Sequence, residues 1–138
     1  MAHWSASVRI AKPPQNVFDT ICDYPSTPQW LKGIKEAKFV TPGPLRPGSK
    51  VKVVRGRITI EFTAKEVVPP RQLTMAISQG KVTGVTTFTL KPDGGGTTVE
   101  HTLDLDLKGL LKLFGFVIGR GLKKDLQALK TRVEGAAN

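Results

Sequence analysis

Residues 97–107, TTVEHTLDLDL, alternate between an apolar and a polar set without interruption, and His101 falls in the apolar set. A two-residue period predicts a β-strand that buries one face. From about residue 109 the period becomes helical, and one apolar stripe joins Ile118, Leu122, Leu126, Leu129 and Val133. Strands with one apolar face need a cover, which a helix with one apolar stripe supplies. We therefore predict an α+β domain in which an antiparallel sheet curls around the last helix.

The other predicted elements lie before residue 97. Strand-like alternation occurs at residues 5–10, 49–55, 58–68, 72–78 and 81–91, with a weaker strand pattern at 35–40. Two short helices are predicted after the first strand, one following a pair of prolines and one around Trp30. The segment PDGGG is a hairpin turn by composition. The pattern therefore predicts about seven strands.

The composition is that of an ordinary folded domain. The chain has 138 residues, 39% hydrophobic and 23% charged, which is enough for one domain with a substantial core and argues against disorder. A single cysteine, Cys22, excludes an internal disulfide and fits a reducing compartment. The N-terminal residues lack the apolar core of a signal peptide, and the most apolar run, 107–119, is too short to span a bilayer. We expect a cytoplasmic protein.

The formal net charge is +10. Residues 32–71 contain ten basic and three acidic side chains, and residues 108–134 contain seven basic and two acidic ones. A surface of this kind attracts anions, or serves only to keep the protein in solution. Nucleic acid is disfavoured as the partner, because residues 32–71 contain only two aromatic residues on which bases could stack, Phe39 and Phe62, and we expect Phe62 to point inward. Residues 109–124 combine apolar residues with Lys and Arg, which suits either a transient contact with an anionic membrane or simple packing.

Four segments carry a family resemblance. They are a helix pattern from Pro14 to Asp23 followed by Trp30, the strand junction VVPPRQL, the hairpin TFTLKPDGGGTTV and the basic helix GRGLKKDLQALK. Together they resemble the START-like (SRPBCC) superfamily of polyketide cyclases/dehydrases and lipid-transfer proteins. The resemblance covers nearly the whole chain and implies a single helix-grip domain over residues 1–138. In that fold, shared with the major pollen allergens, a curved antiparallel sheet wraps around a long C-terminal helix.

The resemblance also implies a large apolar cavity between the sheet and the last helix, open at one end. The inward-facing residues that we expect to line it are Phe62, Met75, Phe88, Leu103, Ile118 and Leu122. By parity, Arg55, Glu66 and Gln79 also point inward at strand ends. If they line the cavity, we expect Arg55 and Gln79 at its mouth; the interpretation that we favour is that all three side chains reach water.

His101 is the one imidazole that we expect in the interior. It has three interpretations: a structural ring satisfied by a neighbour such as Thr86, a contact for the polar end of a ligand, or a general acid or base. Burial lowers the pKa of such a ring and keeps it neutral.

The first functional hypothesis is a protein that binds a hydrophobic small molecule or lipid, with His101 and Thr86 holding its polar end. The alternative is a cyclase or dehydratase-like enzyme that uses the same cavity, with His101 moving a proton. We expect no cofactor and no metal, because two histidines and one cysteine do not match a zinc spacing. No G-x-S-x-G nucleophile motif occurs, and the glycine loop leads into a strand instead of the helix that a phosphate loop requires.

Overall fold

The structure, a computed structural model, describes residues 2–79, 82–106 and 115–135. In this part of the chain, seven strands form one antiparallel sheet in the spatial order β1-β7-β6-β5-β4-β3-β2. The strands are β1 (Ala2–Ile10), β2 (Ile34–Phe39), β3 (Lys50–Arg55), β4 (Ile58–Val68), β5 (Gln72–Gln79), β6 (Val82–Asp93) and β7 (Gly96–Asp106). The helices are α1 (Pro14–Cys22), the 3₁₀ helix η1 (Tyr24–Gln29) and α2 (Gly115–Glu134).

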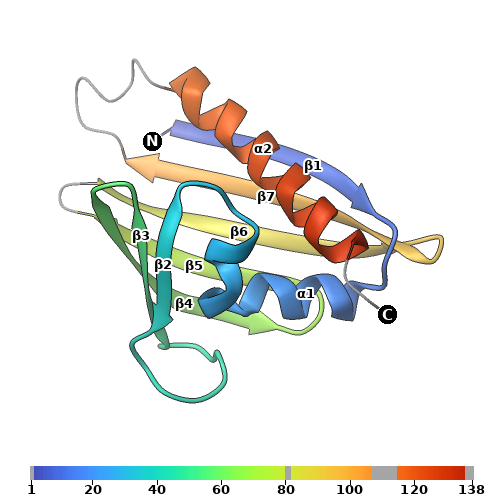
Figure 1. Ribbon diagram of the computed structural model, residues 1–138, viewed down its shortest axis with the longest axis horizontal. Helices are drawn as coiled ribbons and strands as arrows, with labels where there is room; N and C mark the ends of the chain where they lie inside the picture. Colours follow the sequence, from blue (N-terminus) through green and yellow to red (C-terminus); the bar gives the residue numbers. More distant parts are fainter. Residues whose placement is uncertain (1, 80–81, 107–114, 136–138) are drawn as a thin grey trace.

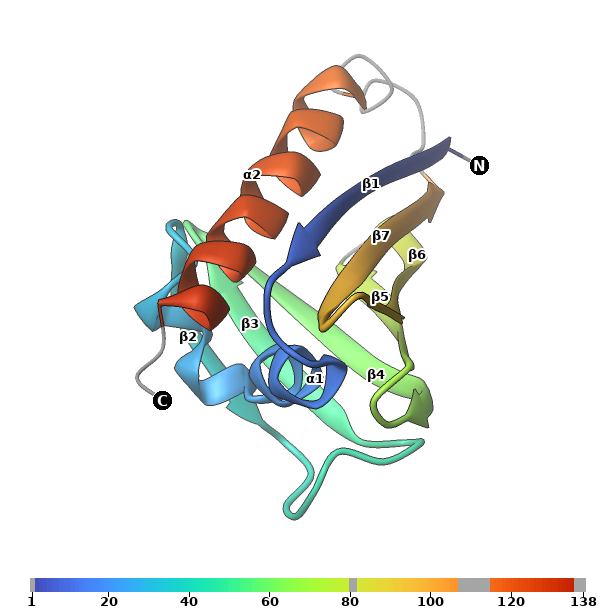
Figure 2. The same cartoon turned by 90° about the vertical axis from the view of Figure 1, so that its right-hand side faces the viewer.

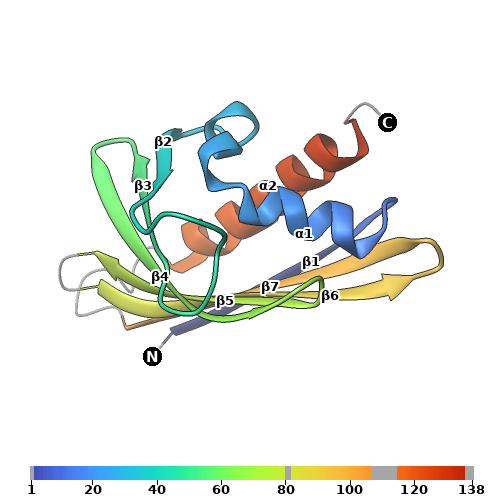
Figure 3. The same ribbon diagram turned by 90° about the horizontal axis from the view of Figure 1, so that it is seen from below.

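The sheet is curved, and the helices all lie on one side of it (Figure 1, Figure 3). Figure 2 shows that the two edge strands, β1 and β2, lie on either side of α2. This arrangement confirms the predicted helix-grip architecture, in which the sheet wraps around the C-terminal helix.

The apolar stripe of α2 is buried, as its helical spacing predicts. Four stripe residues each expose 5% of their surface or less: Leu122, Leu126, Leu129 and Val133. The side chain of the fifth, Ile118, lies outside the described residues. Among the helices of the described ranges, none is both long and apolar enough to cross a membrane.

Strands β6 and β7 form a long hairpin that contains His101 and two other predicted site residues, Thr86 and Phe88. Its register places Phe88 opposite His101 and Thr86 opposite Leu103. At the turn, Gly94 and Gly95 have φ values of 57° and 86°. Glycine adopts this left-handed conformation without the steric penalty of a Cβ atom, so the PDGGG segment forms the predicted tight turn.

Two short helices follow β1, as predicted. Helix α1 begins at Pro14, where the missing N–H is not needed because first-turn N–H groups have no partner within a helix. The second helix, expected around Trp30, ends one residue before it. The Trp30 N–H donates to the Thr27 carbonyl (3.2 Å) and closes the last turn.

One inference from parity is wrong. Alternation along β4 groups Glu66 with the inward-facing residues, but the register with β5 shifts between Ala64 and Glu66. A bulge of this kind adds one residue to the strand and exchanges its two faces from that point on. Glu66 is therefore exposed, and the next residue, Val67, packs against the core.

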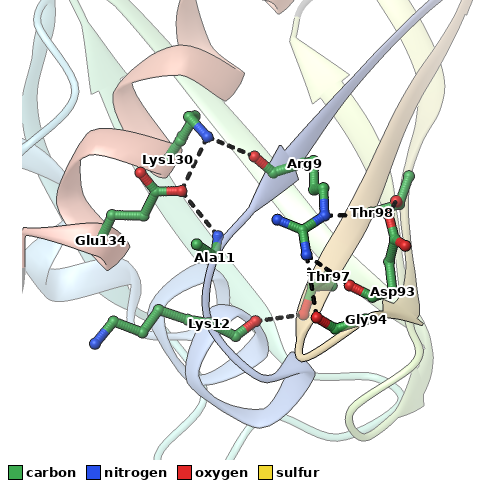
Figure 4. Close-up of polar contacts among 9 residues, drawn as sticks. All are labelled: Arg9, Ala11, Lys12, Asp93, Gly94, Thr97, Thr98, Lys130 and Glu134. Carbon is green, nitrogen blue, oxygen red and sulfur yellow. Dashed lines mark hydrogen bonds and ion pairs between the residues drawn. The ribbon is translucent and has the colours of Figure 1, made fainter.

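Polar contacts fasten the C-terminal end of α2 to the link between β1 and α1 (Figure 4). Lys130 Nζ donates to the Arg9 carbonyl (2.7 Å) and to the Glu134 carboxylate (2.9 Å). The same carboxylate accepts the Ala11 N–H (2.8 Å). These contacts fix the position of the C-terminal end of α2 relative to the end of β1.

The hairpin β6–β7 joins the same cluster. The Arg9 guanidinium donates to the Asp93 carbonyl (2.8 Å) and forms an ion pair with the Asp93 carboxylate (3.3 Å). The hydroxyl of Thr97, which is fully buried, donates to the Lys12 carbonyl (2.7 Å). We refer to Arg9, Ala11, Lys12, Asp93, Thr97, Lys130 and Glu134 together as the α2 clasp.

Candidate functional site

A cavity of about 150 Å³ lies between the sheet and α2. Its wall takes residues from all three helices and from β2, β3, β4, β6 and β7. Most of these side chains are apolar, and four are aromatic: Tyr24, Trp30, Phe62 and Phe88. A volume of roughly 150 Å³ suits a benzene-sized group, whereas pockets for drug-sized ligands begin at about 300 Å³. The cavity is therefore smaller than the large one that the resemblance implies.

Five of the predicted site residues lie in this wall: Arg55, Phe62, Thr86, Phe88 and His101. Met75 and Leu122 are buried and Leu103 is half-buried, but none of these three belongs to the wall. The side chains of Gln79 and Ile118 lie outside the described residues. Alternation identifies the inner face of a strand, and it does not say how far along the strand the cavity extends.

Part of the wall was not indicated by the sequence pattern. Tyr24, Trp30 and Leu31 come from η1 and the residues after it, and Asp125 comes from α2. The helical period contained one signal for Asp125, which lies at the edge of the apolar stripe because it follows Leu122 by three residues and precedes Leu129 by four. No comparable period marks the residues around η1, whose place depends on how the chain crosses the sheet.

His101 lies in the wall with only 8% of its surface exposed. Its Nε2 is 2.6 Å from the Thr86 hydroxyl, so the partner predicted from the neighbouring strand is present. The Phe88 ring stacks on the imidazole, with 4.1 Å between ring centroids and 12° between planes. Burial lowers the pKa of His101 to about 4 because a charged ring would lose its hydration. The imidazole is therefore neutral at physiological pH.

The second ring nitrogen of His101 has an open hydrogen bond. Nδ1 is buried and has no partner among the described residues. The Thr86 hydroxyl also lies 3.4 Å from the Thr102 carbonyl. If the hydroxyl donates to that carbonyl, it accepts from Nε2–H, and Nδ1 is a free acceptor; if it donates to Nε2, Nδ1–H is a free donor. Both tautomers leave Nδ1 able to bond one further group.

Trp30 presents the same situation in the same wall. Its indole Nε1 is buried and has no hydrogen-bond partner in the described ranges, and an indole N–H can only donate. Within the described part of the chain, Trp30 Nε1 and His101 Nδ1 are the two buried side-chain polar atoms that lack a partner. Native proteins satisfy most such atoms, so two open ones in one small wall mark this cavity as the candidate site.

An ion pair joins the sheet to α2 beside the cavity. The Arg55 guanidinium is 3.7 Å from the Asp125 carboxylate, and both residues belong to the wall. Burial raises the pKa of Asp125, and the charge and hydrogen bond of Arg55 oppose this rise. The Arg55 side chain is 46% exposed, so it lies at the cavity edge and also reaches water.

The free cysteine is not a reactive group. Cys22 is half-buried, and desolvation followed by the charge of Asp19 raises the pKa of its thiol to about 12. The thiol therefore stays protonated, and the thiolate is the nucleophilic form. In the ranges that the structure describes, no group of three or more His, Cys, Asp or Glu side chains is placed to hold a metal ion.

Three solved structures illustrate what the chain is similar to. A START superfamily protein from Mycobacterium smegmatis has a TM-score of 0.81 and 18% identity, covering 96% of this chain and 97% of that one. TTHA0849 from Thermus thermophilus has a TM-score of 0.78 and 23% identity, covering 99% and 100%. Ara h 8.0201 has a TM-score of 0.79 and 16% identity, covering 98% and 99%. At these identities the matches show a shared fold.

No curated protein matches this sequence. The sequence model of one family, described as "Polyketide cyclase / dehydrase and lipid transport", matches residues 1–134. That match includes both strands of the β6–β7 hairpin, the two short helices and all of α2. The chain therefore belongs to the polyketide cyclase / dehydrase and lipid transport family.

Proposed function

We propose that this protein binds a hydrophobic small molecule, or the apolar end of a lipid, in the cavity between the sheet and α2. The observation that carries the proposal is an apolar wall containing two buried polar atoms, Trp30 Nε1 and His101 Nδ1, with no partner within the described residues. A buried polar atom without a partner destabilises a fold by about 1–3 kcal/mol. A bound ligand with a polar group would remove that penalty, and this makes the wall better suited to a ligand than to a closed core.

The two open atoms restrict the polar group of the ligand. Because the Trp30 N–H only donates, it pairs with an acceptor such as a carbonyl, ether or hydroxyl oxygen. His101 pairs with either a donor or an acceptor, according to its tautomer. The aromatic rings of Phe62 and Phe88 favour a flat or ring-containing apolar part.

The alternative is a cyclase or dehydratase activity in the same cavity, which the family description includes. A general base works best when its pKa lies near the operating pH. The pKa of His101 is about 4, so the ring is a weak base at neutral pH. We therefore rank binding above catalysis; the cytoplasmic location and the membrane contact of residues 109–124 stay predictions.

The test is native mass spectrometry before and after delipidation, followed by titration with the neutral fluorescent probe N-phenyl-1-naphthylamine. The phenyl ring of this probe matches the benzene-sized cavity, and we expect its naphthyl group to lie outside, at the cavity edge near Arg55. We expect a co-purifying ligand and saturable uptake of the probe. The chain offers a matched pair of variants on one strand face: Val53 is in the cavity wall, whereas Val51 is fully buried in the packed core.

Val53→Phe fills the cavity, so we expect probe affinity to fall at least tenfold while the fold is retained. Val51→Phe overpacks a site without space and should lower the free energy of unfolding by about 1–3 kcal/mol without removing uptake from the folded fraction. Uptake unchanged by Val53→Phe, or no uptake by the wild-type protein, would show the proposal to be wrong.

A further inference from the structure

A second hollow, of about 560 Å³, adjoins the cavity. The two share four wall residues, Trp30, Leu31, Arg55 and Asp125, and therefore meet at this boundary. The second hollow extends from there between the end of η1 and one face of α2. We refer to it as the basic groove.

The basic groove carries a net positive charge. Its charged residues are Lys32, Arg55, Lys124, Arg132 and Asp125. Asp125 pairs with Arg55 at 3.7 Å, and Arg132 donates to the neutral amide oxygen of Gln29 (2.9 Å). In the described part of the chain, Lys32, Lys124 and Arg132 thus have no carboxylate partner. Several cations along one hollow attract anions.

Small residues keep the helix side of the groove open. Gly121 and Ala128 lie two helical turns apart on the face of α2 that also carries Lys124. Apart from the adjacent backbone of the helix, a Cβ atom added at Gly121 would meet no atom of the described residues within 4 Å. Glycine is a poor helix former, and no packing contact among the described residues requires it at this position. The effect of Gly121 is to leave open space beside Lys124.

We propose that the basic groove binds the anionic headgroup of the ligand whose apolar part occupies the cavity. The ligand class is then an anionic amphiphile: a ring system or short chain joined to a carboxylate, phosphate or sulfonate. Lys32 and Lys124 act as point charges on the anion, and Arg132 offers a planar set of donors. The inference rests on the proposed function, since the apolar part must enter the cavity to place its headgroup here.

The test compares two probes with the same aromatic skeleton. N-phenyl-1-naphthylamine is neutral, and 8-anilino-1-naphthalenesulfonate differs from it by one sulfonate group. We expect the sulfonate probe to bind the wild-type protein at least fivefold more tightly at low ionic strength, with a preference that declines as salt is added. Equal affinities would overturn the groove assignment and leave the proposed function standing. Uptake of neither probe would overturn both.

Adjacent lysines on α2 give the matched control. Lys123 and Lys124 are both exposed, but only Lys124 lines the groove. We expect Lys32→Gln combined with Lys124→Gln to weaken the sulfonate probe about three- to tenfold and to leave the neutral probe within twofold. Lys123→Gln should change neither. Equal effects of Lys123→Gln and Lys124→Gln would mean that overall charge, and not the groove, selects the anion.

Gly121→Leu provides a second test that leaves every charge in place. Gly121 lines the groove and a Cβ atom added there meets no described neighbour beyond the adjacent helix backbone, so we expect the larger side chain to extend into the groove; leucine also favours the helix. We expect the sulfonate preference to be lost with no decrease in melting temperature. An unchanged preference would count against the groove as the headgroup site.

The headgroup can come from a free molecule or from a bilayer, and two arms separate these sources. In the first, hexyl phosphate and hexanol compete with the bound sulfonate probe. In the second, the protein is sedimented with phosphatidylcholine vesicles with and without phosphatidylglycerol. Displacement by hexyl phosphate but not hexanol supports a free ligand, and sedimentation with phosphatidylglycerol that Lys124→Gln reduces and Lys123→Gln does not supports a bilayer source. Failure in both arms would overturn the inference.

Discussion

The α2 clasp and the cavity wall both include residues of the C-terminal helix, but they differ in whether their polar atoms have hydrogen-bond partners. In the clasp, the Glu134 carboxylate bonds Ala11 and Lys130, and the Thr97 hydroxyl bonds the Lys12 carbonyl. In the wall, His101 and Trp30 each hold a buried nitrogen without a partner among the described residues. On the proposed function, a ligand supplies these missing partners, and stability and binding then depend on different parts of one helix–sheet interface.

Acidification should affect these two regions in different pH ranges, and this is the largest effect that we predict. The pKa of His101 is about 4 in the folded protein and near 6.5 in the unfolded chain, so between these values the unfolded chain binds more protons. Lowering the pH through this window should reduce the free energy of unfolding by up to about 3 kcal/mol. Urea unfolding at a series of pH values measures it, and His101→Phe should remove it.

The clasp responds at lower pH. The Ala11 N–H, followed by the bond from Lys130, lowers the pKa of Glu134 below its ordinary 4.5. Its contribution to stability is therefore complete above pH 4.5 and is lost as the pH falls through the lower, folded value. Glu134→Gln should lower the free energy of unfolding by a constant amount above pH 4.5, and should change the slope of its pH dependence only below about pH 4.5. A change of slope between pH 4.5 and 6.5 would contradict the separation of the two regions.

Removal of one clasp bond should be the next largest effect. Thr97→Val keeps the shape of a fully buried side chain and deletes its hydrogen bond to Lys12. We expect the free energy of unfolding to fall by about 1–2 kcal/mol, measured by urea unfolding at pH 7. Probe binding should be unaffected, since Thr97 is not in the cavity wall. A loss of binding in the folded protein would show that the clasp and the wall are coupled.

Gly121→Ala should stabilise the protein by about 0.5–1 kcal/mol, because alanine is the better helix former and, beyond the adjacent helix backbone, the added methyl group meets no described residue within 4 Å. Thermal unfolding measures the gain. A gain of this size would show that the helix face beside the groove is not optimised for stability, in contrast to the clasp. Destabilisation would mean that the space at Gly121 is needed by the fold itself.

The smallest predicted effect on stability is that of His101→Phe at pH 7.5. The phenyl ring can stack on Phe88 as the imidazole does, and the open Nδ1 disappears together with the bond to Thr86. These contributions oppose each other, so we expect the free energy of unfolding to change by less than about 0.5 kcal/mol. Affinity for a ligand with a polar end should nevertheless fall. A large loss of stability would make His101 a structural residue first.

The periodic elements could be predicted from the sequence. The alternation around His101 indicated the inner face of β7, and the helical stripe indicated Leu122, Leu126, Leu129 and Val133 as the buried side of α2. In these segments one local period decides which side chains meet the core. The partnership of Thr86 with His101 followed in the same way, because neighbouring strands with a shared inner face bring such residues together.

The remaining features depend on contacts that no local pattern records. The bulge after Ala64 leaves the alternation of β4 unchanged in the sequence and still reverses the side that Glu66 faces. Met75 shares its parity with the wall residues and belongs to the packed core. Trp30 enters the wall because η1 places it there, and that follows from the path of the chain over the sheet. Which inward residues line a cavity is thus a three-dimensional property.

The two tautomers available to His101 have a consequence for ligand selection. A ketone and the alcohol formed by its reduction differ in whether the oxygen can donate, and a neutral imidazole serves either by shifting one proton between its nitrogens. The Trp30 indole N–H can donate to either molecule, since each offers an oxygen lone pair. On the proposed function, such a site would be insensitive to the oxidation level of its ligand. It would discriminate by the outline of the carbon skeleton, and the same protein could then serve a compound before and after a redox step.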